Sequence, residues 1–353
     1  MKLVIATGGT GGHIFPALCV AEKFREKGGS VIFFGTKEGM EAKIVPNEGF
    51  KIEYISSARF MGKRHLERFL GLHKVIKGII QSLKLLVREK PSFVLGMGGF
   101  VSFPSVLSAI LLGIPAYIHE QNVDLGLSNR LLFRFVKKVF LSFEETARIY
   151  RIEKYLVTGN PVRKSVKEDG GPKKEALFSI FAFGGSRGAR SINEAMADLL
   201  RFFDGLKGIV IYHQTGFEDF ERMRGIYSKF RLEAYVFPFT DHMGMYYSMS
   251  DVVVSRAGSS TIFELASRKK PAILVPYPFS AGAHQLKNAR YVERIGGGIV
   301  VEDEKLDGKR LYEILSMLMR NRDLLEKMGE KIHGIYIPDS EDRIVNEILG
   351  DRG

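Results

Sequence analysis

The chain has 353 residues, of which 45% are hydrophobic, so it is long enough to bury two cores and two domains are expected. The formal net charge of +12 favours an anionic partner such as phosphate groups or an acidic membrane. Basic residues are not interleaved with aromatic stacking motifs, so nucleic acid is not an expected partner. The single cysteine, Cys19, excludes an internal disulfide and favours a reducing cytosol.

Short apolar runs rich in Val, Ile and Phe alternate along the chain with longer amphipathic segments. Alternating strands and helices predict parallel sheets, and two such series predict two doubly wound α/β domains. We expect domains at 1–160 and 161–337, joined through the Gly-, Pro- and charge-rich stretch 158–175, with a closing helix in 338–353. The predicted strands are 3–7, 30–35, 93–97, 116–119 and 138–142, then 177–183, 208–213, 233–237, 251–255, 272–276 and 298–302.

Residues 59–90 hold nine basic and two acidic residues, and so contribute seven of the twelve net positive charges. An amphipathic helix with Lys and Arg on its polar face can lie on anionic lipid, whereas a domain helix packs its apolar side into the core. Both readings apply here, with Leu83 and Leu86 expected in the core and Phe69 and Ile76 at the surface. The interleaved apolar residues are Leu66, Phe69, Leu70, Ile76, Ile79, Ile80, Leu83 and Leu86.

Residues 91–118 carry no charge, but they do not predict a membrane span. Three prolines and four glycines divide this run into pieces shorter than the roughly 20 residues that a spanning helix needs. A buried strand, a glycine loop, a short helix and a second strand explain the same residues.

Three glycine loops follow predicted strands, at 8–13 (GGTGGH), 96–100 (GMGGF) and 184–190 (GGSRGAR). Backbone without side chains can approach a ligand closely, and the helix after such a loop directs unpaired N–H groups toward an anion. We therefore expect these loops to bind phosphate groups at the carboxyl ends of the strands.

Two other phosphate-binding motifs are not supported. The loop at 8–13 is not G-x-G-x-x-G, although Glu38 near the second strand keeps a dinucleotide site open as an alternative, and no Walker A motif occurs. No D-x-D pair or close cluster of metal-binding residues occurs either, so neither a metal nor a cofactor is expected.

Seven segments, taken together and in order, resemble the MurG family: GGTGGHIFPAL (8–18), LGMGGFVSFP (95–104), HEQN (119–122), GNPVR (159–163), GGSRGAR (184–190), RAGSSTIFEL (256–265) and HQLKNA (284–289). The resemblance implies a metal-independent, inverting GT-B glycosyltransferase with two Rossmann-like domains facing a central cleft. It implies transfer of N-acetylglucosamine from UDP-GlcNAc to an undecaprenyl-linked acceptor, lipid I, by a peripheral enzyme on the cytoplasmic face of the inner membrane.

The resemblance also implies the site. Gly98 and Gly99 are expected at the acceptor diphosphate, and Glu264 at the ribose hydroxyls, because a carboxylate accepts two hydrogen bonds at once. The residues expected around UDP-GlcNAc are Thr10, Gly11, Gly12, Asn122, Arg163, Ser186, Thr240, Ser259, Ser260, Thr261, Glu264 and Gln285.

Inversion needs one in-line displacement, a general base and groups that hold the departing diphosphate. His13 is the first candidate for the base, because its reference pKa of about 6.5 lies near neutrality. Glu120 is the second candidate, and it is also placed to brace the loop around Asn122. Two other functions stay open at this point, a UDP-sugar epimerase of the same fold and a non-catalytic nucleotide-sugar binding protein.

Overall fold

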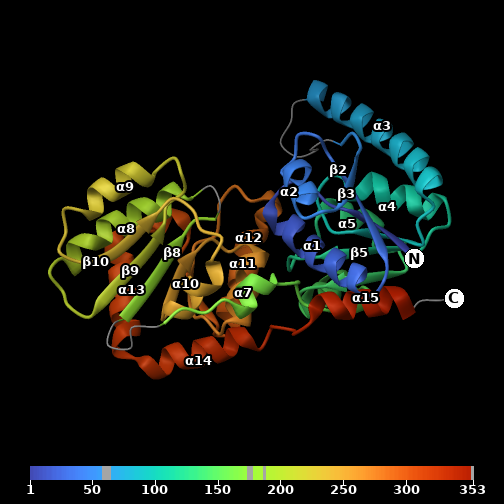
Figure 1. Cartoon of the computed structure of the whole chain (residues 1–353). Helices are drawn as coiled ribbons and strands as arrows, with labels where there is room; N and C mark the ends of the chain where they lie inside the picture. The colour runs from blue at the N-terminus through green and yellow to red at the C-terminus, as the bar shows by residue number, and fades with distance from the viewer. Residues whose placement is uncertain (58–64, 173–177, 186–187, 351–353) are drawn as a thin grey trace. The chain divides into compact units, whose positions relative to one another are not determined.

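The computed structural model describes residues 1–57, 65–172, 178–185 and 188–350. The chain forms two compact units, Met1–Arg163 with Ile337–Gly353, and Lys164–Tyr336 (Figure 1). Each unit contains one sheet, of seven and six strands respectively, in which the strands pair in parallel. This confirms the predicted fold class of two Rossmann-like α/β domains.

The first sheet has the strand order β3-β2-β1-β4-β5-β6-β7. Its order reverses between β1 and β4, which pair from Leu3 opposite Phe93 to Ala6 opposite Gly96. Both of these strands are buried along almost their whole length, as expected of a parallel sheet covered on both faces. The strands are β1 Lys2–Ala6, β2 Ser30–Gly35, β3 Lys51–Tyr54, β4 Phe93–Gly96, β5 Ala116–Glu120, β6 Lys138–Leu141 and β7 Tyr155–Val157.

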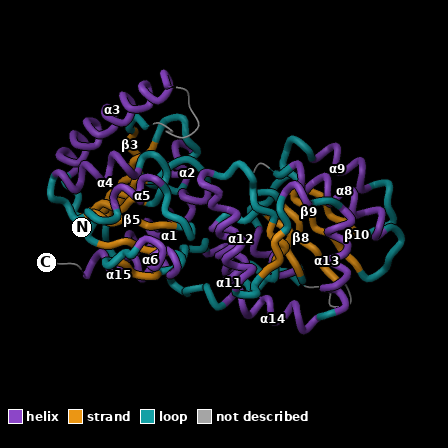
Figure 2. The backbone as a smooth tube through the Cα atoms, turned by 180° about the vertical axis from the view of Figure 1, so that it is seen from behind, coloured by secondary structure: helices purple, strands orange, loops and turns teal. Residues whose placement is uncertain are grey.

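Helices cover both faces of this sheet (Figure 2). One core lies between the sheet and helices α1 and α15, and includes Phe24, Ile344 and Val345. The other core lies on the opposite face, with Leu86 and Val106 among its members. The helices are α1 Gly11–Glu26, α2 Glu41–Asn47, α3 His65–Glu89, α4 Ser102–Leu111, α5 Leu127–Leu132, α6 Glu144–Tyr150 and α15 Ser340–Gly350.

The second sheet repeats this topology in the order β10-β9-β8-β11-β12-β13. Here the order reverses between β8 and β11, which pair from Ile180 opposite Val252 to Phe183 opposite Ser255. The strands are β8 Phe178–Phe183, β9 Ile209–Gln214, β10 Glu233–Phe237, β11 Val252–Ser255, β12 Ala272–Leu274 and β13 Gly298–Val300.

The core of the second unit packs α8, α13 and α14 against its sheet, with Ile192, Leu199 and Leu315 fully buried. Two short 3-10 helices, Ala281–Ala283 and Asp303–Lys305, lie between the longer elements. The helices are α7 Lys164–Glu168, α8 Arg190–Phe203, α9 Phe220–Tyr227, α10 Met243–Met249, α11 Ser259–Ser267, α12 His284–Arg294, α13 Gly308–Arg320 and α14 Arg322–His333.

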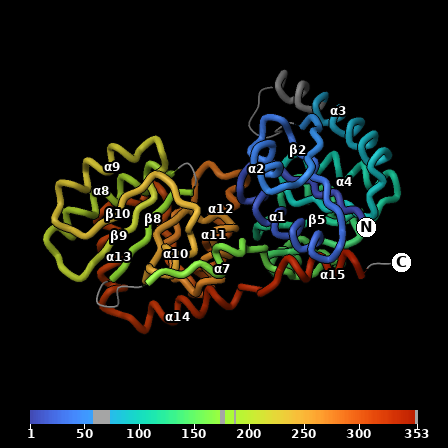
Figure 3. The backbone as a smooth tube through the Cα atoms, in the orientation of Figure 1, coloured from blue at the N-terminus to red at the C-terminus, as the bar shows by residue number. Residues whose placement is uncertain are grey.

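The uncharged run 91–118 forms β4, a glycine loop, α4 and the start of β5, as predicted. Within the part of the chain that the structure describes, no helix has both the length and the apolar composition of a membrane span. Helix α15, near the end of the chain, lies beside α1 from its beginning (Figure 3).

Candidate functional site

The glycine loops follow the strands at which the order of each sheet reverses. The loop at 8–10 follows β1 and the loop at 97–101 follows β4, while 184–189 follows β8 and 256–258 follows β11. In open α/β sheets this reversal leaves a crevice at the carboxyl ends of the strands, where ligands bind. The topology therefore places one candidate ligand-binding site in each unit.

In the first unit, the loops after β1 and β4 touch each other. A side chain on Gly99, whose φ is +79°, would collide with the carbonyl oxygen of Gly8, so this approach requires glycine. Thr10 lies at the N-cap position of α1, and Gly11 and Gly12 are its first two residues. The unpaired N–H groups of the first turn of α1 consequently lie at the predicted phosphate loop.

His13 lies in the first turn of α1, beside the loop after β4. Its Nδ1 atom is 3.1 Å from Oε1 of Gln121, and Nε2 of Gln121 donates a hydrogen bond of 2.7 Å to the carbonyl oxygen of Met97. Gly98 is packed against this pair, because a Cβ atom there would lie 2.5 Å from Nδ1 of His13. Gly98 N in turn donates to Oγ of Ser102 at 2.9 Å.

Glu120, the last residue of β5, is buried and accepts hydrogen bonds on both carboxylate oxygens. Oε1 accepts from the backbone N and from Nδ2 of Asn122, while Oε2 accepts from Gly126 N and from Nδ2 of Asn129. Burial raises the pKa of the Glu120 carboxyl, and these hydrogen bonds oppose that shift. The carboxylate therefore fixes the loop that carries Asn122.

A second buried carboxylate, Glu41, was not identified from the sequence. Its Oε1 accepts hydrogen bonds from N and Oγ1 of Thr36, at 2.9 and 2.7 Å, and its Oε2 accepts one of 3.2 Å from Gly9 N. Glu41 is the first residue of α2 and thereby ties the loop after β2 to the glycine loop after β1. In the sequence, Glu41 is an acidic residue a few positions after a predicted strand. Many exposed helices begin in this way, so the pattern does not indicate a buried site residue.

In the second unit, Gly188 packs against the loop after β9, where a side chain would collide with the carbonyl oxygen of Thr215. Gln214 joins this region to Thr240, since Nε2 of Gln214 donates to Gly185 O at 3.2 Å and its Oε1 accepts from Thr240 N at 3.2 Å. Ser186 lies outside the described residues. Gln214 is thus a further site residue that motif reasoning missed.

A buried network lies behind this glycine loop. Nδ2 of Asn193 donates to Thr215 O at 2.9 Å, and Oδ1 of Asn193 lies 3.1 Å from Nε2 of His213. Nδ1 of His213 lies 3.0 Å from the hydroxyl of Tyr227. Burial lowers the pKa of His213 to about 3, so the imidazole ring is neutral. Nδ2 of Asn193 also donates to the carboxylate of Asp219 at 2.7 Å, so the network behind the loop ends on an acidic group.

The loop after β11 leads into α11, whose first three residues are the predicted Ser259, Ser260 and Thr261. Glu264, in the second turn, accepts a hydrogen bond of 2.9 Å from the hydroxyl of Tyr247. Arg256 donates to Oγ of Ser191 in α8 at 2.9 Å and pairs with Asp303, so it connects this loop to the helix after β8. The two loops at the reversal point are therefore held together.

The last two predicted site residues, Gln285 and Arg163, do not lie in the loops described above. Oε1 of Gln285, in α12, accepts a hydrogen bond of 2.9 Å from Tyr277 N. Arg163 belongs to the first unit, where its guanidinium lies 4.4 Å from the ring centroid of Phe15 in α1. A cation over an aromatic ring is favourable, which accounts for this position beside the first glycine loop.

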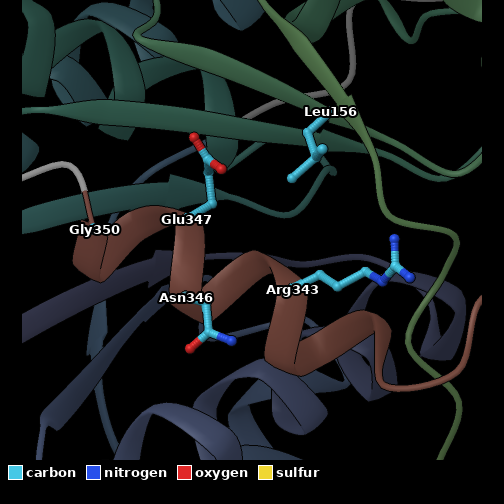
Figure 4. Close-up of a pocket in the computed structure, with 5 residues that line it drawn as sticks. All are labelled: Leu156, Arg343, Asn346, Glu347 and Gly350. Carbon is cyan, nitrogen blue, oxygen red and sulfur yellow. The ribbon is translucent and has the colours of Figure 1, made fainter.

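Metal-binding groups and pockets are two further indications of where a ligand could bind. Across the described ranges, no group of three or more His, Cys, Asp or Glu residues has the geometry of a metal site. A pocket in the first unit is lined by residues of β7 and α15 and by no residue of the glycine loops (Figure 4). Its lining residues are Leu156, Arg343, Asn346, Glu347 and Gly350.

Comparison with known proteins identifies the class of enzyme to which the chain belongs. Residues 3–141 match the glycosyltransferase family 28 N-terminal domain and residues 179–343 match the family 28 C-terminal domain, so the chain is a glycosyltransferase. A protein of Halothermothrix orenii named UDP-N-acetylglucosamine–N-acetylmuramyl-(pentapeptide) pyrophosphoryl-undecaprenol N-acetylglucosamine transferase is 39% identical, over 99% of this chain and 98% of that protein. The crystal structure of Acinetobacter baumannii MurG matches with a TM-score of 0.83 and 30% identity, over 99% of both chains. The chain belongs to the MurG family.

The fold is also shared by an enzyme of another class. A solved UDP-GlcNAc 2-epimerase from Neisseria meningitidis, bound to UDP-GlcNAc, matches with a TM-score of 0.68 at 16% identity, over 99% of this chain and the whole of that one. At this identity the likeness extends to the fold alone.

Proposed function

We propose that the chain transfers N-acetylglucosamine from UDP-GlcNAc to the C4 hydroxyl of undecaprenyl-diphospho-N-acetylmuramoyl-pentapeptide, which converts lipid I into lipid II in peptidoglycan synthesis. The observation that carries this proposal is the match, over nearly the full length of both chains, to a transferase named for this reaction. The glycine loops at the reversal point of each sheet support it, because they supply backbone N–H groups suited to diphosphate.

The second unit is the proposed binding site for UDP-GlcNAc. Ser259, Ser260 and Thr261 at the start of α11 offer N–H groups and hydroxyls to the diphosphate, and Ser186 and the loop after β8 are assigned to the same task. Glu264 is assigned to the ribose hydroxyls, and its bond to Tyr247 fixes one carboxylate oxygen. Thr240 is assigned to the base, and Gln285 to the sugar.

The first unit is the proposed site of acceptor binding and proton removal. The acceptor oxygen bonds to C1 of N-acetylglucosamine while the bond from C1 to the β-phosphate oxygen breaks, and the bonding electron pair leaves with UDP. His13 takes the hydroxyl proton. We assign Glu120 to bracing, because both of its oxygens accept hydrogen bonds from the loop that carries Asn122.

The remaining residues of the site in the first unit are assigned by position. Thr10, Gly11 and Gly12 begin α1, so their N–H groups are assigned to the sugar and diphosphate of the donor, and Asn122 to the transferred sugar. Gly98 and Gly99 are assigned to the diphosphate of the acceptor. Arg163, stacked on Phe15, is assigned to the negative charge that develops on the leaving group.

Helix α3 is the proposed membrane-facing surface. Ile76, Ile80 and Val87 are exposed on it at helical spacing, while Val75 and Leu86 are buried against the domain. Lys74, Lys77 and Lys84 are exposed on the same helix. The side chains of Leu66, Phe69 and Leu70 lie outside the described residues. An exposed stripe of isoleucine and lysine suits an anionic lipid surface, which implies a peripheral enzyme on the cytoplasmic face of the membrane.

The transferase is tested by incubating the purified protein with UDP-GlcNAc and a short-chain lipid I analogue in EDTA. We expect release of UDP together with a β-linked disaccharide. Loss of UDP-GlcNAc without acceptor, with formation of its C2 epimer, would establish an epimerase instead. Binding of UDP-GlcNAc without either product would indicate a binding protein, and a requirement for added metal would contradict the metal-independent mechanism.

A further inference from the structure

Gln121 is a buried amide whose orientation is set by the backbone. Only 2% of its surface is exposed, and it follows β5 directly. Its hydrogen bond of 2.7 Å ends on the carbonyl oxygen of Met97, an atom that can only accept. The NH₂ group of Gln121 must therefore point to Met97, which turns its Oε1 atom toward His13.

This orientation determines which nitrogen of His13 carries a proton. Oε1 of Gln121 is an acceptor and lies 3.1 Å from Nδ1 of His13, so Nδ1 must supply the hydrogen. In a neutral imidazole only one nitrogen is protonated, and a hydrogen bond at one nitrogen selects the tautomer. The lone pair of the neutral ring is consequently on Nε2.

We propose that Gln121 is a positioning residue that holds His13 in the Nδ1–H tautomer, so that Nε2 is the atom that receives the acceptor's proton. The tautomer assignment stands on the geometry alone, while its catalytic consequence rests on the proposed role of His13 as base. The chain of contacts runs from Met97 O, after β4, through Gln121, after β5, to His13 in α1.

Gly98 is the second observation that supports this arrangement. Its φ is +92°, and a Cβ atom at this position would lie 2.5 Å from Nδ1 of His13 and 3.2 Å from Oε1 of Gln121. Any side chain at position 98 would push the imidazole and the amide apart. Glycine thus permits the contact that selects the tautomer.

The tautomer can be read directly from ¹⁵N-histidine NMR spectra, because protonated and bare ring nitrogens resonate far apart. The chain has eight histidines, and His13→Asn identifies the signals of His13 by their disappearance. At a pH where the ring is neutral, we expect the proton on Nδ1 in the wild-type protein. A proton on Nε2 would overturn the proposal without any activity measurement.

Two substitutions of Gln121 separate positioning from simple packing. Gln121→Met removes both hydrogen bonds at similar volume, and we expect it to release the tautomer. Gln121→Glu loses the donor to Met97 but keeps an acceptor opposite Nδ1, so it should retain the Nδ1–H tautomer. If the role were only to tie β5 to β4, both variants would behave alike, and that result would contradict the proposal.

Gln81→Met is the matched control, because Gln81 likewise bonds to the backbone of another segment, its Oε1 accepting from Ser56 N at 2.7 Å, but has no hydrogen bond to His13. It should leave the His13 spectrum unchanged. In Gln121→Met we also expect kcat to fall about tenfold with KM for UDP-GlcNAc unchanged, a loss smaller than the ~10²–10⁴ that a general base contributes, because His13 itself is still present. If Gln121→Met lost the Nδ1–H tautomer but kept full kcat, Gln121 would still be the residue that orients His13, and the assignment of His13 as general base would be wrong.

Discussion

The carbonyl oxygen of Gly8 occupies the space that a side chain on Gly99 would need. Gly99 also has a φ of +79°, so an alanine there meets both the strain of the left-handed region and a collision with backbone. Gly113, at the end of α4, has a φ of +69° but no atom within 4 Å of its Cβ position. Alanine substitutions at Gly99 and Gly113 therefore separate the effect of backbone strain, which both share, from the effect of disturbing the contact between the loops, which only Gly99 makes.

We expect Gly113→Ala to lower the free energy of unfolding by about 1–2 kcal/mol, the cost of the left-handed conformation, and to leave kcat/KM unchanged. Gly99→Ala should destabilise more and should also reduce kcat/KM, because a shift of about 1 Å at reacting groups can cost about 10²-fold. Urea unfolding and initial rates measure both effects. Equal losses of activity in the two variants would show that contact between the loops is irrelevant.

The sequence predicted residues with a motif, and missed residues whose role depends on a distant backbone atom. Gly8–His13 and Gly98–Gly99 were predicted because a glycine loop after a strand is a local pattern. Gln121, Glu41 and Gln214 were missed because their partners are Met97 O, Gly9 N and Thr240 N, each on another loop. A side chain that orients another one leaves no periodic signal, so it emerges only from three-dimensional contacts.

At the scale of single elements, α3 combines a side that packs in the core with the proposed membrane-facing side. Leu86 is 1% exposed and belongs to the core, whereas Ile76 is 49% exposed, as predicted from the spacing. Leu83 is half-buried between these extremes. The exposed side therefore presents apolar and basic groups together. If this side binds lipid as proposed, neutralising its lysines isolates the contribution of the basic groups.

We expect replacement of Lys74, Lys77 and Lys84 by Gln to weaken binding to anionic vesicles by about 3 kcal/mol, or roughly 10²-fold, because each lysine near the surface contributes about 1 kcal/mol. Binding to neutral vesicles should not change. Cosedimentation measures both quantities.

The control replaces three exposed lysines of the second unit, Lys207, Lys229 and Lys309, by Gln. It changes the net charge equally, so the same loss of vesicle binding in both triple variants would indicate non-specific attraction. Turnover of a water-soluble acceptor should be the same in the α3 variant and in the wild type. A loss of that turnover would mean that the α3 lysines act within the site and not on lipid.

The sequence predicted the central strands and missed two edge strands, β3 and β7. Central strands such as β4 are continuous apolar runs because both of their faces are buried. β3 has the sequence KIEY and β7 has YLV, and both are only partly buried at the rims of the first sheet. Their pairing is supplied by β2 and β6, so no local pattern of hydrophobicity distinguishes them from loops.

At the scale of the whole molecule, one histidine in each unit is buried and neutral among the residues whose burial the structure describes. Burial lowers the pKa of His119 in β5 to about 4, and that of His213 in β9 to about 3, from an ordinary value of 6.5. Between pH 6.5 and about 4 the unfolded chain binds protons at these positions and the folded chain does not. Acidification across this window therefore favours unfolding.

We expect the free energy of unfolding to fall as the pH drops from 6.5 to 4, by up to about 1.4 kcal/mol per pH unit for each histidine. The raised pKa of Glu120 acts in the opposite sense, since the folded state then binds the extra proton. Urea unfolding at pH 7, 6 and 5 gives the slope. His119→Gln and His213→Gln should each flatten it, and an unchanged slope in both variants would refute this source of acid sensitivity.

The sequence also predicted two parallel α/β domains, because two series of strands and helices separated by a Gly- and Pro-rich stretch leave few alternatives. It did not indicate where Arg163 lies, because the side chain is positioned by Phe15, almost 150 residues earlier in the chain. Contacts of this sequence separation are set by tertiary packing and not by local preference.

The first unit is assembled from both ends of the sequence, with Ile344, Val345 and Ile348 of α15 fully buried in its core beside α1. A ribosome synthesises all of residues 164–336 before these three side chains exist. The second unit is thus complete as a continuous segment while the first still exposes an apolar surface on α1. The first unit is therefore the first to be started in synthesis, but its core can be completed only after the second unit has been made.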